Sequence, residues 1–149
     1  MSSDDRPILA ITIGDPAGIG LEVVLKALYH DEVYRHCRPL VVGDQRILER
    51  AAAWIDAPPP DYTLVQEPAA GRYVSGAVTL LDLANAAPES CPPGVVGIAA
   101  GRAAVEYVFR ACDLALARPL AAEWVQAGNG QSHDHVPGVV SGWALLDLW

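Results

Sequence analysis

Residues 7–13 read Pro-Ile-Leu-Ala-Ile-Thr-Ile, and residues 14–20 after them read Gly-Asp-Pro-Ala-Gly-Ile-Gly. The first stretch is apolar and rich in β-branched residues, which is typical of a strand buried on both faces in a parallel sheet. The second stretch consists of turn-forming residues. Apolar residues then recur at helical spacing, at Leu21, Val24, Leu25 and Leu28. The region therefore predicts a strand, a glycine loop and a helix.

The same unit recurs in the next part of the chain. Residues 40–42 form a short apolar run that predicts a second strand, which ends at Gly43. Asp44 is a favourable N-cap for a following helix. The apolar residues predicted to form one face of that helix are Ile47, Leu48, Ala51, Ala52 and Ile55. The prolines at 58–60 should end it.

Two more strands and a long helix complete the pattern. Strands are predicted at 62–66 and 77–83, a proline-rich loop at 85–97, and a helix at 99–118. The residues predicted to form the apolar face of this helix are Val105, Val108, Phe109, Cys112, Ala115 and Leu116. Alternating strands and helices with buried-type strands predict an α/β sandwich with a largely parallel sheet.

The charge and the residue content of the chain exclude several classes of function. The net charge of −8 and the pI near 4.7 disfavour binding to nucleic acid or to an anionic membrane, because the field of the protein repels phosphate groups. The first residues lack the pattern of a signal peptide, and no apolar run is long enough to span a bilayer. The three cysteines form no CxxC pair. These features predict a cytoplasmic protein.

The glycine loop is the candidate binding site, with Gly14, Asp15, Gly18, Ile19 and Gly20 as its cofactor-binding residues. It follows a strand, where ligands bind in open α/β sheets, and it opens a helix whose N–H groups favour an anion. The alternative is a tight turn that uses glycine for steric reasons alone. The spacing fits neither the G-x-G-x-x-G dinucleotide motif nor a Walker A loop, so a nucleotide would bind here in some other way.

The chain has four histidines that are candidate metal ligands or catalytic residues. His133 and His135 could face the same side of a strand and hold a metal, but an exposed polar loop is the simpler interpretation, because no third ligand is apparent. His30 and His36 follow the first helix, where a partly charged imidazole suits the helix dipole. The sequence therefore assigns no metal ligand and no catalytic residue.

Two acidic residues and two cysteines are also interpreted as structural. Glu106 and Asp113 lie on the polar face of the long helix and should be solvated. Cys112 belongs to the apolar face of that helix and is predicted to lie in the core. Cys91 lies in a loop with no basic neighbour in the sequence to activate its thiol.

Three segments resemble one enzyme family. Residues 11–20 with Glu22 are similar to the opening signature of the 4-hydroxythreonine-4-phosphate dehydrogenases. Residues 38–44 and 100–107 resemble later segments of that family, in the expected order. Leu21 departs from the family, which usually carries proline there, a residue well suited to a first helical turn.

The resemblance implies an isopropylmalate-dehydrogenase-like fold, a homodimer, NAD and a divalent metal (zinc, magnesium or cobalt). The implied reaction oxidises and decarboxylates a phosphorylated four-carbon hydroxy acid in pyridoxal phosphate biosynthesis. A metal suits this chemistry, because a cation stabilises the developing alkoxide while hydride leaves. Close relatives act on threonate or erythronate phosphate, and the sequence does not separate these substrates.

The resemblance extends over roughly residues 7–120, so residues 1–122 are interpreted as the amino-terminal part of the fold. Residues 123–149 do not match the family and contain Trp124, Trp143 and Trp149. The resemblance implies that the metal and phosphate ligands lie beyond this part, so the fold is expected to be incomplete and the chain inactive alone. The alternatives are a non-enzymatic ligand-binding module and a short enzyme that uses His133 and His135. The tail is expected to stand outside the fold, with fast amide exchange, and the chain to have low solubility.

Overall fold

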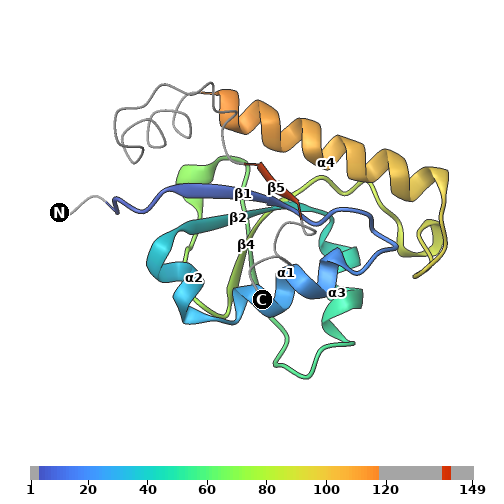
Figure 1. Ribbon diagram of the computed structural model, residues 1–149, viewed down its shortest axis with the longest axis horizontal. Helices are drawn as coiled ribbons and strands as arrows, with labels where there is room; N and C mark the ends of the chain where they lie inside the picture. Colours follow the sequence, from blue (N-terminus) through green and yellow to red (C-terminus); the bar gives the residue numbers. More distant parts are fainter. Residues whose placement is uncertain (1–3, 118–138, 142–149) are drawn as a thin grey trace.

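The structure is a computed structural model that describes residues 4–117 and the backbone of 139–141. Its strands are β1 (Ile8–Thr12), β2 (Arg38–Gly43), β3 (Asp61–Leu64), β4 (Ala77–Asp82) and β5 (Val139–Ser141). Its helices are α1 (Gly20–Leu28), α2 (Asp31–His36), α3 (Gln45–Ala52) and α4 (Ile98–Leu116), with 3-10 turns η1 (Pro68–Ala70) and η2 (Pro88–Ser90). Helices α1, α2 and α3 lie on one side of the sheet and α4 on the other, so the fold has three layers (Figure 1).

The sheet is parallel throughout its described part. The strand order is β3-β4-β2-β1-β5, and every neighbouring pair runs parallel. Aligned residues of parallel strands share a face, so Ile11, Val41 and Leu80 point to one side. Thr12, Val42 and Leu81 point to the other side. The predicted α/β class with a largely parallel sheet is confirmed.

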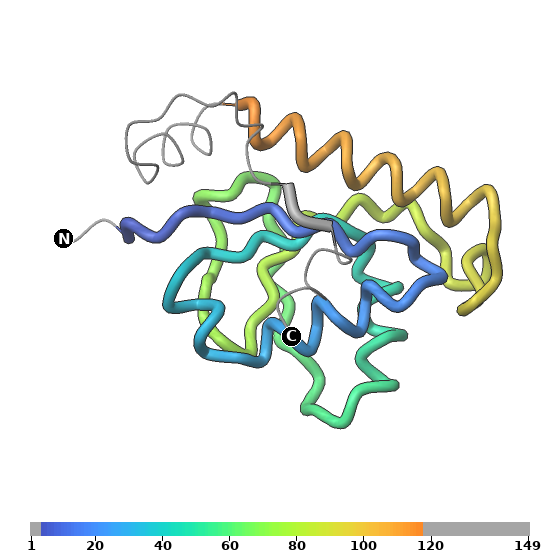
Figure 2. Tube along the Cα trace, viewed as in Figure 1, coloured from blue at the N-terminus to red at the C-terminus, as the bar shows by residue number. Residues whose placement is uncertain are grey.

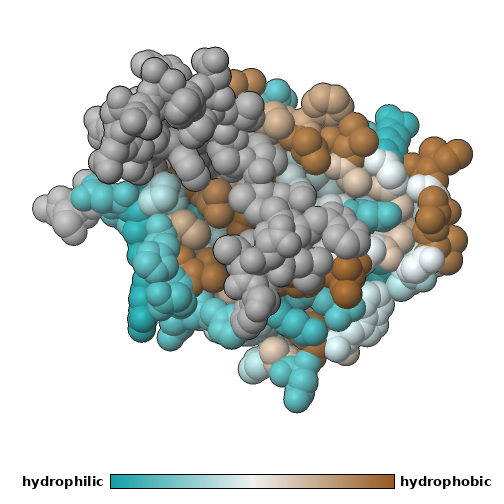
Figure 3. All heavy atoms as spheres, in the orientation of Figure 1, coloured by the Kyte–Doolittle hydropathy of each residue, from teal (hydrophilic) through white to brown (hydrophobic). Residues whose placement is uncertain are grey.

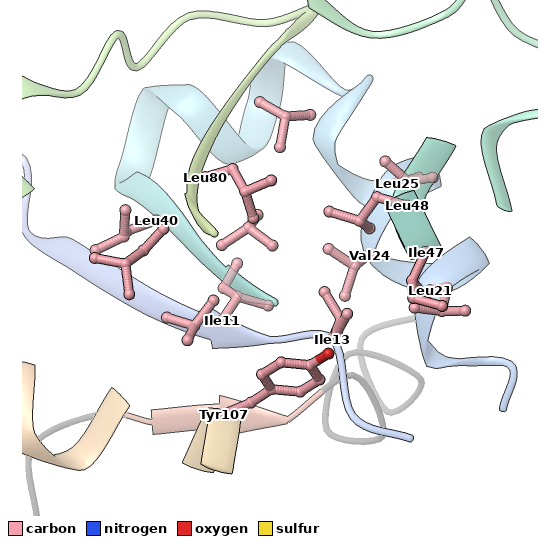
Figure 4. Packing of buried hydrophobic residues seen from close by; sticks show 14 of the residues in the cluster. Ile11, Ile13, Leu21, Val24, Leu25, Leu40, Ile47, Leu48, Leu80 and Tyr107 are labelled. Atoms are coloured by element: carbon pink, nitrogen blue, oxygen red, sulfur yellow. The ribbon is translucent and has the colours of Figure 1, made fainter. Parts of the chain in front are cut away.

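The main core lies between the sheet and α1 and α3. Figure 4 shows Val24 and Leu48 on the side of β1 to which Ile13 points, with Tyr107 of α4 on the opposite side. Packing is close enough to require a glycine at the end of β2. A Cβ atom on Gly43 would lie 2.6 Å from Cδ1 of Ile13. Gly43 therefore ends the strand, as predicted, and also admits the isoleucine of the neighbouring strand.

The apolar face predicted for α4 is largely wrong. Val105, Val108, Phe109 and Leu116 are exposed, and Cys112 is half-buried rather than in the core. The face that packs on the sheet consists of smaller residues and one tyrosine: Ala100, Ala103, Tyr107, Ala111, Leu114 and Ala115. Small side chains let a helix approach a sheet closely, and alanine carries too little hydrophobicity to mark that face in the sequence. Of the predicted face, only Ala115 is buried.

The other α-helices and the strands up to residue 117 agree with the predictions within a few residues, except for helix α2. Helix α2 was not predicted, because six residues are too short for an apolar period to show. Its single buried residue is Tyr34, whose hydroxyl donates to the carbonyl oxygen of Ala77 (3.1 Å). In the described part of the chain, no helix is long and apolar enough to cross a bilayer.

Strand β5 comes from the segment that was expected to stand outside the fold. Its three residues pair in parallel with β1, with Val140 opposite Ile11. This pairing differs from the expectation for the tail, because a parallel sheet provides a backbone partner wherever an edge strand is open. The other residues of 123–149 lie outside the described residues, so the proposed boundary at 122 stays a prediction.

Candidate binding site at the carboxyl ends of the strands

An aspartate follows or ends each of three neighbouring strands. Asp15 comes soon after β1, Asp44 directly follows β2, and Asp82 is the last residue of β4. Because these strands are parallel and adjacent, their carboxyl ends meet at one edge of the sheet. Ligands of open α/β sheets bind at this edge. The glycine loop and the start of α4 lie at the same end of the molecule (Figure 2).

The glycine loop is shaped by its own aspartate. Gly14 has φ +72°, a left-handed conformation that glycine adopts without strain. A carboxylate oxygen of Asp15 accepts a hydrogen bond from the N–H of Ala17 (2.8 Å), and its carbonyl oxygen accepts one from the N–H of Gly18 (2.9 Å). Asp15 therefore holds the turn, a structural role that the sequence did not assign to it.

Helix α1 begins at this loop without a side-chain cap. Its N-cap residue is Ile19, which has no side-chain oxygen, and Gly20 is the first helical residue. The first N–H groups of a helix have no partner within the helix and attract anions. Glu22 in the first turn opposes an anion, but Nζ of Lys26 lies 3.7 Å from its carboxylate. An anion at this helix end would therefore meet backbone N–H groups rather than a basic side chain.

The five predicted site residues lie in one loop, residues 14–20, but they are not equally accessible. Ile19 is 50% exposed, whereas Gly20 is buried against the fold. Gly14, Asp15 and Gly18 are half-buried. A Cβ atom on Gly18 would lie 3.3 Å from the carbonyl oxygen of Asp15, so a side chain there would press on the turn. Ile19 is therefore the most exposed residue of the loop.

Arg50 of α3 joins the glycine loop to the loop between β4 and α4. One nitrogen of its guanidinium donates to the carbonyl oxygen of Pro16 (2.8 Å). Another donates to the carbonyl oxygens of Pro88 (3.0 Å) and Cys91 (2.8 Å). The N–H of Gly94 also donates to the carbonyl oxygen of Ala17 (2.8 Å). Arg50 could not be predicted from the sequence, because its partners are backbone carbonyl oxygens, which leave no signal in the sequence.

Asp44 is completely buried and shapes two loops. Its carboxylate caps α3 by accepting from the N–H of Arg46 (3.0 Å), as predicted, and also accepts from the N–H of Ala86 (2.8 Å). Nη2 of Arg46 lies 2.8 Å from the same carboxylate. Burial raises the pKa of Asp44, but the hydrogen bonds and charge of Arg46 and the N–H of Ala86 outweigh burial and lower it overall. Asp44 is therefore an ionised structural anchor.

Asp82 also organises the edge. One of its carboxylate oxygens accepts from the N–H of Gln45 (3.1 Å) and from the N–H of Ala84 (3.0 Å). Ala84 has φ 50°, a left-handed conformation that is uncommon for alanine, and the bond to Asp82 helps to hold it. All three aspartates at this edge thus accept backbone hydrogen bonds that shape the loops.

Two buried hydroxyl groups lie on the α4 side of the sheet. Thr12 and Tyr107 are both fully buried, and neither hydroxyl has a hydrogen-bond partner among the described residues. In the view of Figure 4 the Tyr107 hydroxyl points toward the chain that follows β1. Burial raises the pKa of Tyr107, so its hydroxyl stays protonated and can donate. Neither hydroxyl was singled out in the sequence, because only the fold brings them to one side.

Several sequence interpretations change with the structure. Glu106 is not simply solvated, because its carboxylate accepts from Nδ2 of Asn85 (2.6 Å) and from Nε of Arg102 (3.0 Å). These hydrogen bonds lower its pKa. Cys91 does have a basic neighbour, Arg50, but burial dominates and raises the pKa of its thiol. Cys91 is therefore still interpreted as structural, because its thiol is buried and not because it lacks a basic neighbour.

The histidines take no part in this edge within the described structure. His36 lies on the exposed surface with Nε2 at 2.9 Å from a carboxylate oxygen of Glu32. His30 is the N-cap residue of α2 and makes no side-chain cap hydrogen bond. His133 and His135 lie outside the described residues. Over residues 4–117 and 139–141, no three histidine, cysteine or acidic side chains are grouped so that they could hold a metal.

The chain is similar to known dehydrogenases in sequence and in structure. The chain is 38% identical over 141 residues to the D-threonate 4-phosphate dehydrogenase of Cupriavidus necator, a match that covers 89% of this chain and 42% of the relative. The solved 4-hydroxythreonine-4-phosphate dehydrogenase of Burkholderia phymatum superposes with a TM-score of 0.70 at 33% identity, over 89% of this chain and 42% of that one. The enzyme of the same name from Klebsiella pneumoniae superposes with a TM-score of 0.69 at 30% identity, over 77% and 34%.

A comparison with family models finds no match. The sequence relative and the solved structures nevertheless carry related names, and the solved structures share the α/β fold described above. The chain is therefore a homologue of part of the 4-hydroxythreonine-4-phosphate and D-threonate 4-phosphate dehydrogenases, and it spans less than half of the length of those it matches.

Proposed function

We propose that this chain forms the amino-terminal part of an NAD-dependent dehydrogenase that acts on a phosphorylated four-carbon hydroxy acid. The observation that carries the proposal is the glycine loop at the carboxyl end of β1, which opens the uncapped helix α1 in a chain related to such dehydrogenases. The sequence relative named above acts on D-threonate 4-phosphate, which favours that substrate. 4-Hydroxythreonine 4-phosphate, the substrate in pyridoxal phosphate biosynthesis, and erythronate 4-phosphate are the alternatives.

The loop suits an anionic part of NAD. The left-handed Gly14 turns the chain away from β1, and a Cβ atom at this position would meet open space, so a ligand can approach the backbone. The first N–H groups of α1 supply donors for a phosphate oxygen. In this proposal Gly14, Asp15, Gly18, Ile19 and Gly20 bind the cofactor through their backbone. Asp15 acts by holding the turn.

A divalent metal is proposed only for the larger enzyme. Such a cation would stabilise the alkoxide that develops as hydride leaves. The described residues offer no group that fits a metal, so no step is assigned to one here. We propose that its ligands and the contacts to the substrate phosphate belong to the part of the relatives that this chain does not span, and that the chain alone is inactive. A homodimer in the cytoplasm is proposed by the same resemblance.

A ligand-binding module without catalysis is the second candidate. One observation favours it: Asp15, Asp44 and Asp82 all accept backbone hydrogen bonds, which leaves none of them poised as a general acid or base. Such a module would use the same loop and the same N–H groups. The two candidates therefore share a binding prediction and differ in whether NADH is formed.

Binding of NAD to the glycine loop can be tested by titrating the isotope-labelled chain with NAD and recording amide resonances by NMR. We expect the largest shifts at residues 14–20. Gly18→Val should weaken the apparent affinity about tenfold or more, because its side chain presses on the turn and blocks approach to the backbone. Gly101→Ala is the matched control, since the added Cβ meets open space on α4. Equal affinity of a folded Gly18→Val variant would return the loop to a purely structural role.

A further inference from the structure

Two neighbouring strands lead the chain to opposite faces of the sheet. Strands β2 and β4 are adjacent and parallel. After β2 the chain continues into α3, on the side of α1 and α2, whereas after β4 it continues into α4, on the other side (Figure 1). In open α/β sheets, ligands bind outside the carboxyl ends of two such strands, at the topological switch point. We call residues 43–45 and 82–86, where the two strands end, the switch point.

The glycine loop lies beside the switch point and is not part of it. Strand β1 leads into α1 and its neighbour β2 leads into α3, so both connections run to the same side of the sheet. The topology therefore indicates a second place for a ligand, one strand away along the same edge. None of its residues was predicted from the sequence to bind a ligand.

Buried polar atoms without partners lie at the switch point. Oδ1 of Asn85 is buried and has no hydrogen bond among the described residues, although Nδ2 of the same amide donates to Glu106 (2.6 Å). The hydroxyl of Tyr107 is fully buried and also unbonded there. Burial raises the pKa of Tyr107, and the nearby charges of Asp44 and Asp82 raise it further. Because buried polar groups nearly always have a partner, these two atoms point to a bound molecule.

The switch point offers mainly hydrogen-bond acceptors. Only Oδ1 of Asp82 accepts from the described residues, namely from the N–H groups of Gln45 and Ala84, so Oδ2 can accept from a ligand. Oδ1 of Asn85 is a second acceptor, and the hydroxyl of Tyr107 can both donate and accept. Two acceptors and one hydroxyl match a ligand with two neighbouring hydroxyl groups. The charge of Asp82 disfavours a phosphate at this point.

We propose that the switch point binds a vicinal diol, whose two hydroxyl groups donate to Asp82 and Asn85 while the hydroxyl of Tyr107 bonds to one of them. Such a diol occurs in the ribose of a nucleotide and in the carbon chain of a four-carbon sugar acid. Because the switch point would hold an uncharged part of the ligand whose phosphate binds at the glycine loop, this site rests on the proposed function. Acceptors at one place and the N–H groups of α1 at the other fix the orientation of one ligand.

The segment after β4 has to shift for the diol to reach the buried atoms. Asp82 and Asn85 are half-buried, and Ala84 between them is exposed. Ala84 has φ 50°, and strain of this kind is concentrated at ligand sites and switch regions. A shift of residues 83–86 uncovers Oδ1 of Asn85 and the hydroxyl of Tyr107, and the diol then supplies the hydrogen bonds that both lack.

The surface at this end of the molecule also suits an apolar part of the ligand. Val96 is 97% exposed and Ile98 93%, at the start of α4. Figure 3 shows hydrophobic surface where α4 begins, with hydrophilic residues beside it. A nucleoside combines a flat apolar base with a diol, so it matches both kinds of surface.

Adenosine and D-threonate test the site, because each carries a vicinal diol and neither carries a phosphate. In NMR titrations of the isotope-labelled full chain, we expect at least one of them to shift the amide resonances of residues 82–86 in a saturable way. A response to adenosine assigns the site to a ribose, and a response to D-threonate alone assigns it to the sugar acid. The compounds 2′,3′-dideoxyadenosine and butyrate lack the diol and should cause no such shifts. Equal shifts with these controls, or no shifts with either diol, would overturn the proposal.

Tyr107→Phe should weaken diol binding about fivefold, because it removes one hydrogen bond to the ligand. It should not lower the free energy of unfolding, since the hydroxyl has no partner in the described structure. Tyr62→Phe is the matched control: its hydroxyl is also buried and unbonded but lies on β3, so this variant should keep the affinity of the parent. Equal affinity of Tyr107→Phe and the parent would overturn the proposal. Failure of the proposed function is distinct, because NAD would then leave residues 14–20 unshifted whatever the diols do at residues 82–86.

Discussion

Replacing Arg50 with methionine should lower the free energy of unfolding by about 2–4 kcal/mol. The half-buried guanidinium donates to the carbonyl oxygens of Pro16, Pro88 and Cys91. Hydrogen bonds from a charged donor contribute about 1.5–3 kcal/mol each, but three bonds from one side chain are not additive. Methionine keeps much of the packing volume of the side chain but has no hydrogen-bond donor. The unfolding free energy lost in Arg50→Met should therefore measure mainly the contribution of these hydrogen bonds.

Urea denaturation followed by circular dichroism measures this effect. Arg72→Met is the matched control, because Arg72 and its partner Asp61 are largely exposed and such pairs contribute about 0–1 kcal/mol. Amide exchange at Gly94 should also become faster in Arg50→Met, since its N–H donates to the glycine loop that Arg50 holds. A loss no larger than that of Arg72→Met would show that Arg50 does not hold the two loops together.

Asp44→Ala should cost about 2–4 kcal/mol of unfolding free energy. The substitution removes the N-cap of α3, which contributes about 1 kcal/mol. It also leaves the N–H of Ala86, which is buried, without its acceptor, at a cost of about 1–3 kcal/mol. Asp44→Asn should cost less, because an amide oxygen can still accept one of these bonds. Equal stability of Asp44→Ala and the parent chain would contradict this account of the anchor.

The same carboxylate should make the fold sensitive to acid. The pKa of Asp44 in the folded chain lies below its ordinary value of 3.8, because the bonds from Arg46 and Ala86 outweigh burial. Its contribution to stability is therefore present above about pH 4 and lost as the pH falls through the lower folded pKa. The parent chain should lose more unfolding free energy between neutral pH and pH ~3 than Asp44→Asn. The other carboxylates change the acid stability of both proteins alike. Equal losses of unfolding free energy in the parent chain and in Asp44→Asn would therefore exclude this role for Asp44.

The elements that could be predicted from the sequence are those whose pattern is local. The strand at 7–13 and the helix after Gly20 were predicted because an apolar run and an i, i+3, i+4 spacing are visible without knowing the partner. The face of α4 was not, because this helix has two apolar faces. The hydrophobicity of the larger side chains, such as Phe109, predicted that they would be buried. In the structure they are exposed, and the alanines of α4 pack against the sheet. Which face packs is decided by the shape of the sheet.

The candidate site shows the same limit. The glycine loop could be predicted because Gly14–Gly20 are contiguous and follow a strand. Arg50 could not, because its acceptors are carbonyl oxygens 34 to 41 residues away. Asp44 was predicted as a helix cap, a local role, but its bond to Ala86 spans 42 residues. Contacts to backbone atoms across that distance leave no motif, so only the folded chain shows them.

We propose that this chain carries the cofactor loop of a dehydrogenase without the complete active site. The direct measurement is NADH formation by the purified 149-residue chain with NAD, D-threonate 4-phosphate and added zinc or magnesium. The Cupriavidus necator relative, assayed in parallel, shows that the substrate and conditions support the reaction. Circular dichroism of the same preparation shows that the chain is folded.

We expect that the folded chain forms no NADH above the rate without protein, while its relative forms NADH under the same conditions. The physical reason is that hydride transfer without a metal to stabilise the alkoxide is too slow to observe. Steady NADH formation by the chain, abolished by EDTA and reduced by Gly18→Val, would contradict the account and show that these 149 residues hold a complete site.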